Sequence, residues 1–304
     1  MGLSILIPVY NVNVTGLVHA LAEQLRATGK KGEIVLLDDG SDNKNSTALN
    51  QSLENITSVA FHCNPANEGR MAARQKLSRL ARYDYLLFLD CDSVISKEDF
   101  LSAYFILMDA AVDVASGGRV YTAHPPDDCA LRLHWTYGTK RENRSPDARL
   151  GKGPGFMSNN FLIKKQLFAQ LDSSTELTGY GHEDSWWGIQ FEQLGAACRT
   201  INNPVLHGEL ETAEMFIAKS DQALANLFLL EKKIGKNLLK KHVRIFRWYC
   251  LLRRNRLAGL YLFFEKPFHT YFRKNLLSCK PQLFFFDCYR LARLIQTGRA
   301  TSAI

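Results

Sequence analysis

Residues 83–93 read YDYLLFLDCDS, in which an apolar run at 83–90 ends at Asp90 and a second aspartate, Asp92, follows. Four more runs of this kind lie at 3–9, 33–38, 58–63 and 112–121. Helix-like patterns alternate with them at 14–28, 44–55, 69–82 and 97–111. Continuous apolar runs separated by helix-length segments are typical of a parallel sheet covered by helices on both faces. The sequence therefore predicts an α/β fold with a Rossmann-like, mostly parallel sheet.

The rhythm of strands and helices breaks beyond residue 121. Residues 122–160 carry several prolines and glycines and predict a long functional loop. The predicted elements that follow are a strand at 155–165, a polar turn at 172–182, a helix at 183–194 and a helical region from 215 onward. No internal repeat is present.

Composition and charge exclude several classes of protein. The chain has 304 residues, of which 46% are hydrophobic, and this excludes disorder. No apolar run approaches the roughly 18 residues of a membrane span. The net charge of +8 is uneven, because residues 231–304 hold 17 Lys and Arg against three acidic residues. That basic tail suggests an anionic membrane surface or a nucleic acid as partner.

The cysteines and the first residues favour a cytoplasmic chain. The seven cysteines are scattered and form no CxxC pair, which predicts reduced thiols rather than a disulfide framework or a zinc site. Residues 1–11, MGLSILIPVYN, have no basic segment and are not expected to be a signal peptide.

Carboxylates follow two of the predicted strands, at the edge where ligands of such sheets bind. Asp90 and Asp92 are hard oxygen ligands that suit Mg²⁺ or Mn²⁺ shared with substrate phosphates, although a solvated acidic turn has the same sequence. Asp38 and Asp39 end the run at 33–38, where a carboxylate can bind a base or ribose. Capping of the next helix by neighbouring polar residues is the alternative.

Two arginines and a histidine extend this set. Arg70 and Arg74 lie four residues apart, hence on one helix face, where they could meet a diphosphate or form a solvated basic face. His207 follows a short apolar run. A lone histidine is most often structural, but beside Asp90 and Asp92 it would complete a divalent metal site.

Residues 179–188, GYGHEDSWWG, combine flexible glycines with two carboxylates and two indoles. Glu183 and Asp184 open a predicted helix, so ordinary capping is one interpretation. The alternative is a sugar site, in which Trp186 and Trp187 bind the acceptor and a carboxylate accepts the proton of the attacking hydroxyl.

Taken in order, five motifs resemble the family 2 glycosyltransferases of GT-A fold, which are inverting enzymes that use nucleotide-activated sugars. These motifs are SILIPVYN (4–11), DDGSDN (38–43), the NxGxxxAR pattern (67–74), LFLDCDS (87–93) and GYGHEDSWWG (179–188). The last, followed by a histidine, is also similar to the C-terminal part of galactosyltransferase-type GT-A enzymes. The resemblance covers about residues 1–212. It implies a nucleotide-sugar-binding part at 1–121, an acceptor-binding and catalytic part at 122–214, and a basic helical extension at 215–304.

The resemblance also implies a role for each candidate residue. Pro8, Tyr10 and Asp39 would contact the nucleoside of the donor, and Asp90 would contact its ribose. Arg74 would also bind the donor. Asp92 and His207 would be ligands of Mn²⁺ or Mg²⁺. Asp184 would be the general base and Glu183 would orient the acceptor. The expected reaction is transfer of one sugar, from a UDP-sugar by family frequency, to a hydroxyl of a glycan or lipid-linked acceptor.

Processive family members carry a QxxRW motif, and residues 244–248, RIFRW, replace its Gln with Arg244. This replacement and the missing membrane span favour single addition over polymer synthesis. Two alternatives remain open: a sugar-phosphate nucleotidyltransferase, and an inactive module that binds membrane or nucleic acid. The first normally has a glycine-rich phosphate loop after the first strand, which IPVYNVN (7–13) lacks. The complete acidic set argues against the second, and no nucleic-acid partner is expected.

The basic tail interleaves its charges with apolar residues at near-helical spacing over residues 232–248. A basic amphipathic helix of this kind favours the surface of an anionic membrane. The same stripe would serve equally well to pack a helical subdomain on the catalytic body. The sequence thus predicts a cytoplasmic protein, with residues 232–290 as a possible peripheral contact on the inner face of the cell membrane.

Overall fold

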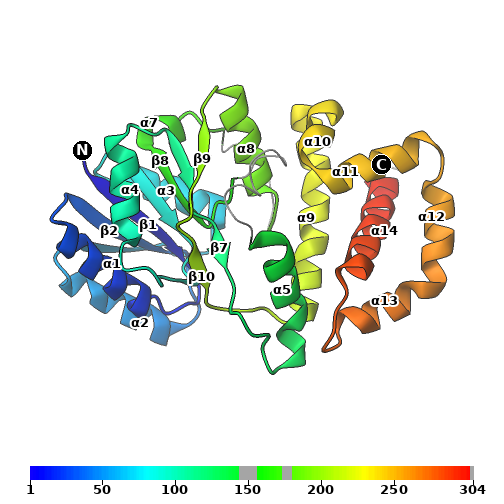
Figure 1. Ribbon diagram of the computed structural model, residues 1–304, viewed down its shortest axis with the longest axis horizontal. Helices are drawn as coiled ribbons and strands as arrows, with labels where there is room; N and C mark the ends of the chain where they lie inside the picture. The colour runs from blue at the N-terminus through cyan, green and yellow to red at the C-terminus, as the bar shows by residue number, and fades with distance from the viewer. Residues whose placement is uncertain (144–155, 173–179, 302–304) are drawn as a thin grey trace.

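The computed structural model describes residues 1–143, 156–172 and 180–301. At its centre lies a seven-stranded sheet in the order β3-β2-β1-β4-β8-β6-β9. Its strands are β1 (Leu3–Val9), β2 (Gly32–Asp38), β3 (Val59–Cys63), β4 (Tyr85–Leu89), β6 (Val114–Ser116), β8 (Asn160–Lys164) and β9 (Cys198–Thr200). Strands β1 to β4 are parallel, and β8 runs antiparallel to both β4 and β6 (Figure 1). The predicted α/β fold with a mostly parallel sheet is confirmed.

A second, smaller sheet and the helices surround this core. The small sheet holds β5 (Ser93–Val94), β10 (Val205–His207) and β7 (Arg119–Val120). The α-helices among the described residues are α1 (Thr15–Thr28), α2 (Lys44–Gln51), α3 (Arg70–Leu80), α4 (Phe100–Asp109), α5 (Arg132–Tyr137), α7 (Lys165–Phe168), α8 (Glu183–Gln193), α9 (Ala213–Ile234), α10 (Lys236–His242), α11 (Arg244–Arg254), α12 (Ala258–Glu265), α13 (His269–Leu276) and α14 (Leu283–Thr301).

The sheet buries both of its faces. Along β1, Ile5 and Ile7 pack with α1 and α4 on one face, while Leu6 packs with α3 on the other. This alternation follows from the two-residue repeat of a strand. Because both faces are covered, the strand reads as a continuous apolar run rather than as alternating polar and apolar residues.

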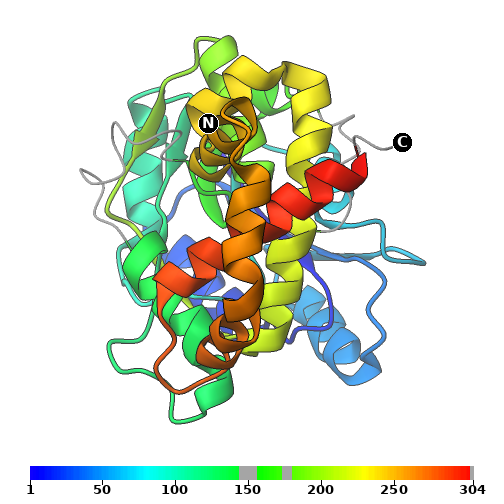
Figure 2. The ribbon, with the colours of Figure 1, turned by 90° about the vertical axis from the view of Figure 1, so that its right-hand side faces the viewer.

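The C-terminal helices divide into a packed layer and an outer arm. Helices α9, α10, α11 and α14 contribute buried residues to the core on the α3 face of the sheet, among them Leu227, Leu239, Phe246 and Leu294. Helices α12 and α13 lie outside this layer, farther from the sheet (Figures 1 and 2). Most of the basic C-terminal region therefore packs on the catalytic body, which was one of the two alternatives for its apolar stripe. No helix of the described chain is long and apolar enough to cross a membrane.

The run at 112–121 forms two strands rather than the one expected. Gly118 has a φ of +80°, and a Cβ on Gly117 would lie 2.4 Å from the backbone oxygen of Asn203. The chain turns at these glycines, so that β6 joins the large sheet and β7 joins the small one.

The expected loop at 122–160 is wrong in part, because α5 and two shorter helical turns occupy 129–142. Residues 144–155 of that loop, and 173–179 of the expected polar turn, lie outside the described residues.

The cysteine prediction is also wrong. Cys129 and Cys279 form a disulfide across 150 residues of sequence, and it links the turn before α5 to the segment between α13 and α14. The other five cysteines, all among the described residues, are thiols. Because disulfides persist in oxidising compartments, cysteine usage no longer supports a cytoplasmic location.

Candidate active site

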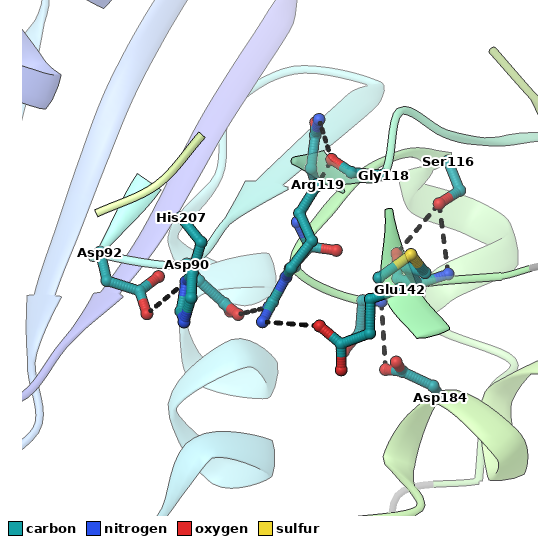
Figure 3. A network of polar contacts seen from close by, with 12 residues as sticks. Asp90, Asp92, Ser116, Gly118, Arg119, Glu142, Asp184 and His207 are labelled. Carbon is teal, nitrogen blue, oxygen red and sulfur yellow. Dashed lines mark hydrogen bonds and ion pairs between the residues drawn. The ribbon is translucent and has the colours of Figure 1, made fainter. Parts of the chain in front are cut away.

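The site begins where β4 ends, at Asp90 and Asp92. The short strand β5 that follows pairs antiparallel with β10, and this pairing sets Ser93 opposite His207. As a result, Nδ1 of His207 lies 3.2 Å from Oδ2 of Asp92 (Figure 3). The two residues predicted to bind a metal are thus brought together from positions 115 residues apart.

The chemistry of this pair fits a divalent cation that is shared with a ligand. Burial opposes the charge of Asp92, but the hydrogen bond and charge of His207, with Arg119 and Arg70, lower the pKa of Asp92 to about 2. The Nε2 atom of His207 is buried and has no hydrogen-bond partner. Among the described residues, no group of three or more His, Cys, Asp or Glu could hold a metal ion. The protein would therefore supply two ligands, and a diphosphate and water the rest, as is usual for Mg²⁺.

Asp90 is held by two arginines. Its Oδ1 lies 2.7 Å from Nη2 of Arg74. Its Oδ2 lies 3.3 Å from Nη2 of Arg119 (Figure 3). Arg74 is fully buried and also donates to the backbone oxygen of Ser158. Its guanidinium stacks on Trp187, with 5.4 Å from Cζ to the ring centroid. Arg74 therefore orders Asp90 from inside the core rather than presenting its own charge to solvent.

Arg70, one turn earlier on α3, is the arginine of this helix that reaches the cavity. It is exposed and lies over the ring of Tyr180, with 5.3 Å from Cζ to the centroid. No carboxylate of the described residues forms an ion pair with Arg70. The four-residue spacing predicted one shared face, but Arg74 is buried and Arg70 is exposed, so the two guanidinium groups lie in different environments.

The expected nucleoside side lies at the ends of β1 and β2. Tyr10 is 42% exposed, and its hydroxyl donates to Asp42 over 3.4 Å. Pro8 is half-buried. Asp39 is buried and accepts hydrogen bonds from the Asn64 side chain and from the backbone N–H groups of Glu68 and Gly69. Its carboxylate thus fixes the loop that starts α3.

The start of α8 has a strained backbone. Gly181 and His182 have φ angles of +105° and +71°, and a Cβ on Gly181 would lie 2.4 Å from Cβ of Ala223. Non-glycine residues rarely adopt this region, and such strain is concentrated at functional sites. The turn lets Glu183, which is buried, accept from the backbone N–H of Gly181.

Asp184 follows on the first turn of α8. Its Oδ1 accepts a hydrogen bond from the backbone N–H of Ser158 over 3.1 Å (Figure 3). Burial and the nearby Glu183 raise the pKa of Asp184, although hydrogen bonds from Ser158 and the charge of Arg74 oppose the shift. A carboxylate whose pKa is raised is a stronger proton acceptor once it is ionised.

Trp186 and Trp187 do not lie where a sugar could stack on them. They are 3% and 1% exposed and belong to the apolar core beneath α8. Nε1 of Trp186 donates to the backbone oxygen of Asp172, and Trp187 packs edge-on against Phe168. The expectation that they bind an acceptor is therefore wrong. Adjacent residues on α8 are both buried because the sheet covers one side of the helix and α9 the other.

A cavity of about 230 Å³ lies between Asp90 at the end of β4 and the start of α8, and the residues that line it do not include Tyr10, Asp39, Asp92 or His207. The residues lining it include Arg70, Asp90, Arg119, Tyr180, Glu183 and Asp184. Sequence reasoning missed Arg119, which also lies 3.8 Å from Glu142. Its position directly after the strand-breaking glycines 117–118 was the available signal. His134 also lies at the site, with 5.1 Å between the centroids of its ring and that of His207. No feature of the sequence indicated this position.

The site thus combines an acidic strand end with two carboxylates at a helix start, at one edge of a mostly parallel sheet. Residues 4–172 match the family described as Glycosyl transferase family 2. This match covers more than half of the chain, which therefore belongs to that family.

An uncharacterized glycosyltransferase from Haemophilus influenzae is 32% identical over 96 residues, which are 32% of this chain and 38% of that relative. The chain thus matches well under half of the relative's length.

Two solved structures share the fold at low identity. A mannosyltransferase from Pyrobaculum calidifontis, in complex with GDP-Man and Mn²⁺, is 15% identical and has a TM-score of 0.52. That match covers 98% of this chain and 86% of the other. Glucosyl-3-phosphoglycerate synthase from Mycobacterium tuberculosis, in complex with Mn²⁺, UDP and glucosyl-3-phosphoglycerate, is 17% identical and also has a TM-score of 0.52. Here 77% of this chain and 80% of the other are covered.

Proposed function

We propose that this chain is an inverting hexosyltransferase that moves one sugar, from a UDP-sugar in the first instance, to a hydroxyl of a glycan or lipid-linked acceptor. The observation that supports this most is the cavity that both Asp90 and Asp184 line. A donor group at the end of β4 and an acceptor hydroxyl at the start of α8 would meet in that space. Simple helix capping at Glu183 and Asp184 would not require such a shared cavity.

In the proposed reaction, the acceptor oxygen forms a bond to the anomeric carbon while the bond from that carbon to the diphosphate breaks. The bonding electrons leave with the nucleoside diphosphate, and the hydroxyl proton passes to Asp184. No enzyme nucleophile intervenes, so the configuration inverts. Glu183 lines the same cavity and is proposed to orient the acceptor.

On the donor side, Pro8, Tyr10 and Asp39 are proposed at the nucleoside and Asp90 at the ribose. Asp92 and His207 would hold Mn²⁺ or Mg²⁺, which neutralises negative charge on the departing diphosphate when it is bound. The unpaired charge of Arg70 offers the same diphosphate an electrostatic partner. Arg74 contributes from behind, by holding the carboxylate of Asp90 over 2.7 Å. This division supports residues 1–121 as the donor part and 122–214 as the acceptor part.

A panel of nucleotide sugars with Mn²⁺ tests this function. UDP-, GDP- and TDP-hexoses are offered with a generic saccharide acceptor, and released nucleoside diphosphate is measured. The expected result is turnover with a UDP-hexose and an inverted anomeric configuration in the product by NMR. Turnover with a GDP-hexose but not with a UDP-hexose would show that the nucleotide base of the donor is guanine rather than uracil. Release of pyrophosphate from a sugar phosphate and a nucleoside triphosphate would show a nucleotidyltransferase instead, and no reaction with any donor would favour the inactive module.

We also propose that the α12–α13 arm (residues 258–276) contacts an anionic membrane surface. Phe263, Phe264 and Phe268 are 72%, 60% and 54% exposed. The exposed charges around them are basic: Arg253, Arg254, Arg256, Lys266, Arg273 and Lys274. Glu265, the acidic residue of the arm, is buried beside His269. Large exposed aromatics among cations suit a surface whose headgroups are negative.

Sedimentation with vesicles tests the arm. Binding to phosphatidylcholine vesicles with 30% phosphatidylserine is expected to fall at high salt and in Phe263→Ser/Phe264→Ser. Ile106→Ser is the matched control, because Ile106 is 68% exposed but lies on α4. Equal binding to neutral and anionic vesicles would contradict the proposal.

A further inference from the structure

A second cavity, of about 610 Å³, adjoins the catalytic one. It is lined by residues from the start of α8, the corner of α10 and α11, α12 and α14. Its walls are largely apolar and include Val243, Ile245, Trp248, Tyr261, Phe284 and Leu291. A volume of this size is within the usual range for an organic ligand.

Three residues line both cavities: His182, Ser185 and Arg290. The apolar space therefore begins where the strained start of α8 ends the catalytic pocket. Anything that occupies both spaces must pass these three side chains. Asp184, the candidate base, lies between His182 and Ser185 in the sequence.

Arg290 carries a positive charge at this junction that no described residue neutralises. Its guanidinium packs over the ring of Phe286, 5.4 Å from the centroid, and its Nε is buried with no hydrogen-bond partner. Burying an unpaired polar group is costly, so such a group is expected to meet a ligand. His182 adds no charge, because burial and the proximity of Arg290 lower its pKa to about 3.

The other charges of the second cavity have a different arrangement. Arg141 and Asp287 form an ion pair over 2.7 Å, so their charges compensate each other. Arg244 is exposed at the outer rim, where it can be solvated. Within this largely apolar cavity, Arg290 is thus the cation that adjoins the catalytic pocket and has no ion-pair partner among the described residues.

We propose that this second cavity binds the apolar chain of an amphiphilic acceptor, and that Arg290 binds an anionic phosphate group joining that chain to the part that receives the sugar. The inference rests on the proposed function and specifies its acceptor as a lipid phosphate. A free glycan would leave its hydroxyls without partners along the apolar walls. Phe284, at 67% exposure, lines the cavity together with Tyr261 of the arm proposed to contact membrane lipid.

Binding of decyl phosphate, below its micellar concentration and without donor, tests this proposal directly. Isothermal titration and thermal shift are measured on the wild type, Arg290→Gln, Arg290→Lys and Trp248→Ala. Decyl phosphate is expected to bind the wild type, and to bind Arg290→Gln about tenfold more weakly because a charge-assisted contact with the phosphate is lost. The affinity is expected to recover in Arg290→Lys, which keeps the positive charge. Trp248→Ala should also weaken binding, since it removes an apolar wall. Arg199→Gln is the matched control, because Arg199 is exposed on β9 and lines neither cavity.

Two further probes separate the head from the chain. Inorganic phosphate and decanol are each expected to bind at least tenfold more weakly than decyl phosphate. Equal affinity of inorganic phosphate would refute the role of the apolar cavity, and an unchanged affinity in Arg290→Gln would refute the role of Arg290. UDP with Mn²⁺ is titrated in parallel. Loss of UDP binding with decyl phosphate binding intact would count against the proposed function and not against this cavity.

Discussion

Replacement of Asp184 by asparagine separates catalysis from binding more cleanly than any other change in this site. Asparagine has nearly the same shape and keeps an oxygen that can accept from the backbone N–H of Ser158, now 3.1 Å from Oδ1. It cannot take up a proton. General-base catalysis contributes a factor of about 10² to 10⁴, so transfer should fall by that factor. At 1.36 kcal/mol per tenfold, this is roughly 3 to 5 kcal/mol of transition-state stabilisation.

The same change should raise stability. Burial raises the pKa of Asp184, so the folded protein binds its proton more tightly than the unfolded chain does. The free energy of unfolding therefore decreases as pH rises from the unfolded pKa, near 3.9, through the raised folded pKa. Above that window the ionised carboxylate destabilises the fold, and a neutral asparagine removes this cost. Transfer has the opposite dependence, because the base must be ionised: its rate should rise with pH and level off above the folded pKa.

The assay measures kcat and KM with a saturating donor, together with thermal unfolding at neutral pH. Asp184→Asn should lower kcat, keep donor affinity and raise the melting temperature. Asp109→Asn is the control for a surface carboxylate, since Asp109 forms a 3.7 Å ion pair exposed to solvent. If Asp184→Asn retains full transfer, Asp184 is a helix cap. If Glu183→Gln abolishes kcat while Asp184→Asn does not, the two roles are exchanged.

Three other predictions follow from the geometry. Arg74→Met should lower the free energy of unfolding, measured in urea, by about 3 to 5 kcal/mol, because it leaves the buried carboxylate of Asp90 partly unpaired. Arg70→Met should leave the stability unchanged and raise the KM for the donor. Equal stability of the two variants would contradict these roles. Asp92→Asn should abolish Mn²⁺-dependent UDP binding by titration, and full turnover in EDTA would refute the metal ligands. Replacing Cys129 and Cys279 with serine should cost about 2 to 4 kcal/mol in a urea melt, with no further effect of dithiothreitol.

The sheet was predictable because it is buried. β1 spans Leu3–Val9, as expected from the apolar run, and β2 to β4 begin and end within two residues of their runs. Buried parallel strands can be recognised from the sequence alone, because they appear as uninterrupted apolar residues that end at polar ones. The split after Ser116 was missed since the close approach of Asn203 to Gly117 comes from a distant segment.

The candidate site was predictable only in part. Asp92 and His207 lie together, as the sequence suggested, but through the antiparallel pairing of β5 with β10, which the sequence analysis did not predict. The environment of Trp187 was not visible in the sequence, since two adjacent indoles read the same way in a sugar site and in a helix enclosed on two sides. The pairing of Cys129 with Cys279 depends on how the C-terminal helices return to α5, and no spacing rule encodes that path.

The two aspartates at the end of β4 illustrate how packing divides roles that spacing leaves equal. Asp90 meets two guanidinium groups, and a further cation beside it would be repelled by Arg74 and Arg119. Asp92 has a more exposed side chain, at 25% against 11%, and its near partner is an imidazole with a free buried nitrogen. A divalent ion is therefore favoured at Asp92, while Asp90, with its charge already balanced, suits a neutral hydroxyl such as that of a ribose. Exchange of Asp90 for asparagine should then weaken UDP binding without abolishing its dependence on Mn²⁺, whereas the same exchange at Asp92 should abolish that dependence. If both variants lose the Mn²⁺ dependence equally, the arginines do not separate the two carboxylates.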